Sequence, residues 1–126
     1  MQMLGDKSEN DVEVSWADQQ RINRFSRLHA RFSDVEEELK ARRTEREELE
    51  DLGMELELLN DERVLYKVGE AYISMEQQEA LMQLEQDTKQ ADQQLERLQG
   101  VMEECETGMK QLKVELYAKF GSNIST

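Results

Sequence analysis

The segment LYKVGEAYIS, residues 65–74, interrupts a chain whose flanking sequence has the pattern of long helices. Two apolar runs surround a glycine here: Val64, Leu65, Tyr66 and Val68 before Gly69, and Ala71, Tyr72 and Ile73 after it. β-Branched and aromatic runs on both sides of a glycine are typical of two short strands joined by a tight turn. The sequence therefore predicts a β-hairpin at about residues 63–74, with Gly69 and Glu70 between its strands.

This hairpin carries apolar groups on both faces. Side chains alternate along a strand, so Val64, Tyr66 and Val68 share one face and Leu65 lies on the other. An isolated hairpin is marginal in water, and its outer edges hold unpaired backbone donors and acceptors. We therefore expect the hairpin residues named above to form an interface with strands of other chains. The alternative is a loop packed back on its own helix ends.

Heptad seams flank the hairpin on both sides. Apolar residues recur at spacings of three and four, the pattern of a coiled coil. The first seam contains Phe25, Leu28, Phe32, Val35, Leu39 and Leu49, and near Leu49 it slips to Leu52, Leu56 and Leu59. The second contains Leu81, Leu84, Ala91, Leu95, Leu98, Met102, Cys105, Met109, Leu112 and Leu116.

Capping signals set the limits of the two helices. Ser15, with Asp18 three residues on, predicts a start near Trp16, and the first helix should run into the fifties and fray near Asn60. Ser74, with Gln77 three residues on, predicts the start of the second helix. That helix should end near Phe120, before Gly121.

The expected fold is mostly α: two long antiparallel coiled-coil helices joined by a short β-hairpin. Two helices of similar length with a short connection pack antiparallel, because neither can bury its seam alone. The domain spans residues 15–120. Residues 1–14 are expected to be a disordered N-terminal tail, and residues 121–126 a C-terminal tail.

Composition excludes several classes of function. The chain has 126 residues, a net charge of −13, one cysteine and no proline. Such an acidic chain is a poor binder of nucleic acid or of anionic membranes, and it has no run of about 18 apolar residues that could span a bilayer. A single cysteine fits a reducing, cytoplasmic compartment. Cys105 falls on the seam and His29 is the only histidine, so no catalytic or metal site and no cofactor are expected.

Charge and apolar residues both concentrate at the helix ends farthest from the hairpin. Residues 15–33 carry a net charge of +3 and residues 110–126 carry +2, whereas residues 34–62 carry −9 and residues 75–109 carry −7. The apolar residues there exceed what one seam needs, and exposed apolar clusters mark binding sites. The candidate binding residues are Trp16, Ile22, Phe25, Leu116, Tyr117, Phe120 and Ile124. Terminal packing against fraying is the alternative.

Three segments resemble the β-type subunits of prefoldin: DVEVSWADQQRINRFSRL (11–28), YKVGEAYIS (66–74) and LKVELYAKFGSNI (112–124). The resemblance implies a heterohexamer of two α-type and four β-type subunits whose hairpins join an intersubunit β-barrel. It also implies that the free helix ends hold unfolded proteins such as actin and tubulin, without ATP, and transfer them to the cytosolic chaperonin. One departure is Leu65, where related subunits often carry a proline.

Two functions remain open from the sequence. The first is a chaperone subunit that captures unfolded proteins with its basic, apolar helix ends, where arginines could also attract acidic clients. The second is a structural coiled-coil adaptor or tether, which needs the seams but gives the strands no role. Dependence of assembly on the hairpin residues would separate the two.

Overall fold

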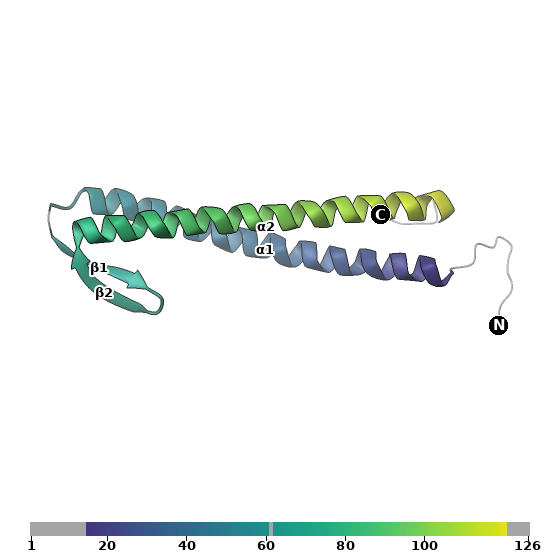
Figure 1. Ribbon diagram of the computed structural model, residues 1–126, viewed down its shortest axis with the longest axis horizontal. Helices are drawn as coiled ribbons and strands as arrows, with labels where there is room; N and C mark the ends of the chain where they lie inside the picture. The colour runs from purple at the N-terminus through teal and green to yellow at the C-terminus, as the bar shows by residue number, and fades with distance from the viewer. Residues whose placement is uncertain (1–14, 61, 121–126) are drawn as a thin grey trace. The chain divides into compact units, whose positions relative to one another are not determined.

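The computed structural model describes residues 15–60 and 62–120, so the expected tails at 1–14 and 121–126, including Ile124, lie outside the described residues. The elements are α1 (Trp16–Glu57), β1 (Arg63–Val68), β2 (Ala71–Glu76) and α2 (Gln77–Phe120) (Figure 1). The chain divides into two compact units. We call Met1–Glu36 with Gly100–Thr126 the terminal unit, and Glu37–Gln99 the hairpin unit.

Helix α1 begins with the predicted N-terminal cap. The backbone N–H of Asp18 donates to Ser15 Oγ at 3.1 Å, and the backbone N–H of Gln19 donates to the carbonyl oxygen of Ser15 at 2.9 Å. Ser15 therefore satisfies one of the backbone donors that have no partner at the start of a helix. Its hydroxyl also donates to Asp18 Oδ2 at 3.0 Å, which holds the first turn of α1 together.

Within the terminal unit, the two helices pack antiparallel with a buried seam. Val35, Cys105 and Leu112 are buried, as predicted. Leu116, which the sequence places both on the seam and among the candidate binding residues, is also buried, one helical turn beyond Leu112. The helices approach closely at Gly108, where an added Cβ would lie 2.9 Å from Leu28 Cδ1.

Within the hairpin unit, the seam continues and slips as predicted. Leu39, Leu84 and Leu98 are buried, and Leu56 forms a cluster with Tyr66, Ala80 and Leu84. The residues of the slipped path pack against this cluster, as do two strand residues; together these are Leu49, Leu52, Leu59, Val64 and Met75. Five further predicted seam residues are partly buried, one in the hairpin unit and four in the terminal unit: Leu95, and Leu28, Phe32, Met102 and Met109.

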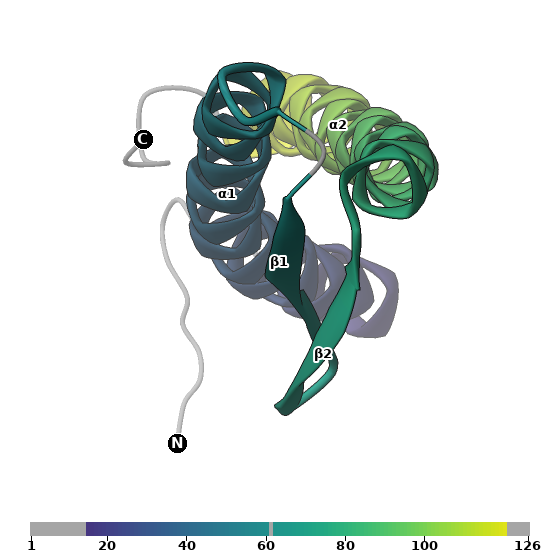
Figure 2. The ribbon, with the colours of Figure 1, turned by 90° about the vertical axis from the view of Figure 1, so that its left-hand side faces the viewer.

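The hairpin forms where the sequence predicts it and is two residues longer. Strands β1 and β2 pair antiparallel with Val68 opposite Ala71, so Gly69 and Glu70 make the turn. Gly69 adopts φ 63°, a conformation that favours glycine. Figure 2 shows the two strands leaving the helices as a separate ribbon.

The start of α2 differs from the prediction. Ser74 is not its N-cap but lies inside β2, opposite Leu65, and its hydroxyl and carbonyl oxygens accept hydrogen bonds from Arg63. The strand continues because Met75 pairs with Val64 and packs on the apolar cluster. Helix α2 therefore begins at Gln77.

Gln77 joins the two helices at the hairpin. Its Nε2 donates to the backbone carbonyl oxygens of Leu56, at 2.6 Å, and Leu59, at 2.7 Å. The last carbonyls of a helix have no partner within that helix, and Gln77 supplies one for the end of α1. Its side chain is buried, so these bonds fix where the hairpin leaves the helices.

Candidate functional site

The hairpin divides into a covered part and an exposed part. Tyr66 was predicted to face other chains, but only 2% of its surface is exposed. Its ring lies in the cluster with Leu56 and Leu84, and its hydroxyl donates to Asp87 Oδ2 on α2 at 2.7 Å. Tyr66 therefore packs on its own helices and does not add to the exposed surface of the hairpin. The inner half of one hairpin face is intramolecular core.

The exposed part of the hairpin includes all of its other face. Cross-strand partners share a face, so Leu65 and Tyr72 lie together with Lys67 and Ser74 on the side away from Tyr66. Leu65 is 69% exposed and Tyr72 is 65% exposed. Val68 and Ala71 at the tip are exposed as well, as is Ile73 opposite Tyr66, so the covered residues of the Tyr66 face are Val64, Tyr66 and Met75.

Asp87 holds the hairpin in this orientation. Its Oδ1 accepts a hydrogen bond from Gln83 at 3.0 Å, while Oδ2 accepts the one from Tyr66. Burial, the bond to Asp87 and the charge of Asp87 raise the pKa of the Tyr66 hydroxyl from its ordinary value of 10.0. The phenol therefore keeps the proton that it donates to Asp87 at neutral pH and into the alkaline range.

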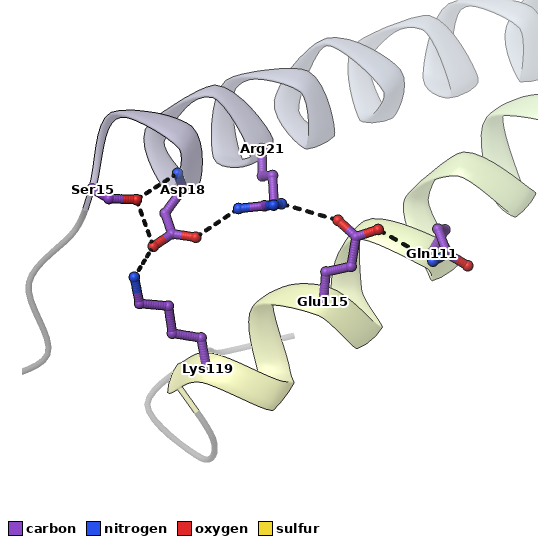
Figure 3. A network of polar contacts seen from close by, with 6 residues as sticks. All are labelled: Ser15, Asp18, Arg21, Gln111, Glu115 and Lys119. Carbon is purple, nitrogen blue, oxygen red and sulfur yellow. Dashed lines mark hydrogen bonds and ion pairs between the residues drawn. The ribbon is translucent and has the colours of Figure 1, made fainter.

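A polar network joins the first turn of α1 to the last turn of α2 in the terminal unit (Figure 3). Asp18 accepts from Ser15, from Lys119 Nζ and from Arg21 Nη1, the last at 2.9 Å. Arg21 Nε also donates to Glu115 Oε1 at 3.0 Å, and Glu115 Oε2 accepts a hydrogen bond from Gln111 Nε2 at 3.2 Å. We call this set the terminal clasp. The contacts of Asp18 with Lys119 and of Arg21 with Glu115 join residues 101 and 94 positions apart, so no local pattern could have indicated these two.

Asp18 is the centre of the terminal clasp. Only 3% of its surface is exposed, and the hydrogen bond from Lys119 is the main cause that lowers its pKa below the ordinary 3.8, with Ser15 and Arg21 adding to it. Asp18 lies near the N-terminus of α1 and Lys119 near the C-terminus of α2, where their charges also complement the helix dipoles.

Replacing Asp18 with Asn is expected to destabilise the terminal unit at pH 7, because Lys119 and Arg21 lose their shared carboxylate. The lowered pKa of Asp18 means that its contribution is complete above pH 3.8 and is lost as the pH falls further. The difference in urea midpoint between wild type and Asp18→Asn should therefore be constant from pH 5 to 8 and shrink in stronger acid. Glu115→Gln is the control: this exposed pair is worth about 0.5 kcal/mol or less. An equal effect of both variants would contradict a central role for Asp18.

Of the predicted binding residues at the helix ends, two are well exposed. Trp16 is 79% exposed in the first turn of α1, and Tyr117 is 44% exposed near the end of α2. Ile22 and Phe25 are partly buried and contribute to the seam side. The side chain of Phe120 lies outside the described residues. Val114, 65% exposed, was not among the predicted residues and adds a further apolar group.

The cysteine, the possible metal ligands and the helix hydrophobicity are the other features of the described chain that bear on function. Cys105 is a buried free thiol on the seam. Between residues 15 and 120, with residue 61 left out, no group of three or more acidic, histidine or cysteine side chains could hold a metal ion. In that same part of the chain, neither α-helix has the length and apolar character needed to cross a membrane.

Comparison with known proteins identifies one family over nearly the whole length of the chain. The family described as prefoldin subunit matches residues 19–123. Prefoldin subunit 4 of Saccharomyces cerevisiae is 40% identical over 126 residues, which cover 99% of this chain and 98% of the relative. The proteins of the same name from Bos taurus and Homo sapiens are each 35% identical over 117 residues, covering 91% of this chain and 87% of the relative.

Proposed function

Because the chain belongs to the prefoldin subunit family, we propose that it joins α-type and β-type prefoldin subunits in a heterohexamer through its hairpin. The observation that carries this proposal is the uncovered hairpin face with Leu65 and Tyr72. The two-stranded sheet also has an open edge on each strand, which another strand can pair with. Strands from neighbouring subunits, arranged as an intersubunit β-barrel, would cover both the face and the edges.

We further propose that the terminal unit holds unfolded client proteins without ATP, in the cytoplasm. The support is the position of Trp16 and Tyr117: both are aromatic, both are exposed, and the terminal clasp joins the turns that carry them. Exposed apolar clusters on otherwise charged proteins mark binding sites. The family resemblance extends this to actin and tubulin as clients and to their transfer to the cytosolic chaperonin.

Serine at both Trp16 and Tyr117 is expected to weaken client holding about thirtyfold, because two aromatic residues at about 1 kcal/mol each contribute about 2 kcal/mol to an interface. The measurement is the concentration of assembled hexamer that suppresses the aggregation of denatured actin on dilution. Native mass of the assembly should be unchanged, since neither residue lies in the hairpin unit.

The matched control replaces two exposed methionines of the hairpin unit, Met54 and Met82, with serine. This variant removes a similar exposed apolar area and should hold clients as well as wild type. Unchanged holding by the Trp16 and Tyr117 variant would remove the terminal unit as the client site. A hexamer that holds no client in any form would instead favour a structural tether.

A further inference from the structure

Helix α1 carries three exposed arginines that pair with no acidic side chain among the residues that the structure describes. Between residues 19 and 33 the chain has no Asp or Glu, although its net charge is −13. Arg21 belongs to the terminal clasp. Arg24, Arg27 and Arg31 are exposed, and none of them forms an ion pair with any residue that the structure describes.

These arginines share one side of α1 with Trp16. At 3.6 residues per turn, positions 16, 20, 24, 27 and 31 fall within a sector of about 80° around the helix axis. All five side chains are exposed. We call Trp16, Gln20, Arg24, Arg27 and Arg31 the arginine stripe. It begins with the most exposed aromatic residue of the described chain and continues as three free cations.

The stripe borders a hollow in the surface of the terminal unit. A groove of about 290 Å³ is lined by Gln20, Arg21, Arg24, Gly108, Gln111, Leu112 and Glu115. Its lining comes from both helices, with Gln20, Arg21 and Arg24 on α1 and the other four residues on α2. Within the groove Glu115 is already bound by Arg21, so Arg24 supplies the free positive charge.

We propose that the arginine stripe binds a short acidic segment of an unfolded polypeptide, with a carboxylate at Arg24 and, about four positions along the segment, an apolar residue on Trp16. This inference rests on the proposed function and adds a client class: segments that combine Asp or Glu with apolar residues. Arginine suits the role because its guanidinium binds a carboxylate through two parallel hydrogen bonds. It is also more weakly hydrated than the ammonium group of lysine, so it loses less on leaving water.

The length of the stripe limits the size of the segment. Trp16 and Arg31 are about 22 Å apart along the helix, which matches about seven residues of extended chain, and the part from Arg24 to Arg31 matches about three. Beyond Arg31 the charge reverses at Asp34 and Glu36, which would repel a longer polyanion. A short acidic peptide therefore fits better than a nucleic acid, whose phosphates continue at regular spacing.

The test uses the assembled hexamer and two labelled peptides of equal apolar content, one with three glutamates and one with three glutamines. Fluorescence anisotropy should show that wild type binds the glutamate peptide about tenfold tighter, because each exposed charge pair contributes about 0.5 kcal/mol. This preference should decrease from 0.05 to 0.5 M salt, since the Debye length falls from about 14 to about 4 Å. Replacing Arg24, Arg27 and Arg31 with Gln should remove the preference and leave binding of the glutamine peptide unchanged.

The control removes the same number of positive charges from the hairpin unit. It replaces three exposed residues, Lys40, Lys89 and Arg97, with Gln. It should keep the preference. Equal losses in both triple variants, or a wild-type preference insensitive to salt, would overturn the proposal. A 12-nucleotide single strand that binds the stripe more tightly than the glutamate peptide would also overturn it, in favour of nucleic acid. Wild type that binds neither peptide contradicts client holding itself, whereas equal binding of both contradicts only the acidic preference.

Discussion

Replacing Leu65 and Tyr72 with serine is expected to leave both helices folded and to prevent entry into the hexamer. Neither side chain contributes to the buried cluster around Leu56, so the monomer loses little. In the assembly, each would be buried against a neighbouring strand, where an apolar side chain of this size contributes roughly 2–3 kcal/mol. Losing both should weaken assembly on the order of 1000-fold.

The measurement is native mass after co-expression with the other subunits, together with helix content of the isolated chain. The Trp16 and Tyr117 serine variant serves as the matched control, because it removes exposed aromatic area from the terminal unit instead. The first variant should remain outside the assembly but helical, and the control should assemble normally. A hexamer that forms with serine at both hairpin positions would contradict assembly through this face.

The hairpin and the seams could be predicted because their signals are local. Gly69 between two apolar runs indicates a turn, and the structure places Gly69 at φ 63° in that turn. Spacings of three and four indicate a seam, and Leu39, Leu98 and Cys105 are buried there. In both cases the residues that interact are related by a short, regular period, which a single sequence shows directly.

The contacts that orient these parts could not be predicted, because they join residues far apart in the chain. Ser74 matches a helix-capping pattern, yet the register of β1 against β2 extends the strand through it. Asp87 looks like an ordinary solvated acid of a helix until Tyr66 is placed beside it. The sequence indicates Asp18 only as part of the helix cap. Its bond to Lys119 depends on how α1 and α2 align in the terminal unit.

In both predicted binding patches, at the hairpin and at the helix ends, some residues are buried and others are exposed. Tyr66 and Leu116 are apolar residues in the predicted patches, and both are buried against their own chain. Leu65 and Trp16 belong to the same two predicted patches, and both remain exposed. Composition identifies which ends of the molecule are rich in apolar groups, but the packing of α1 against α2 decides which of these groups another protein can reach.

Replacing Tyr66 with Ala is expected to release the hairpin from the helices and to destabilise the hairpin unit by roughly 3–5 kcal/mol, the usual cost of removing a buried aromatic ring. Tyr66→Phe keeps the ring and loses only the bond to Asp87, so it should cost about 1–2 kcal/mol. Urea unfolding followed by far-ultraviolet circular dichroism would measure both. The two variants separate the ring, which fills the cluster with Leu56 and Leu84, from the hydroxyl, which sets the orientation of the strands.

Dependence on pH provides an independent check of the Tyr66 anchor. Because the folded state raises the pKa of Tyr66, the hydroxyl contributes its full stability below pH 10 and loses it as the pH rises further. Wild type should therefore lose stability above pH 10 more steeply than Tyr66→Phe, which has no proton to lose. Tyr72→Phe is the matched control, since Tyr72 is exposed and its removal should not change the slope. Identical alkaline slopes for wild type and Tyr66→Phe would show that the hydroxyl does not anchor the hairpin, which the ring alone would then hold on the helices.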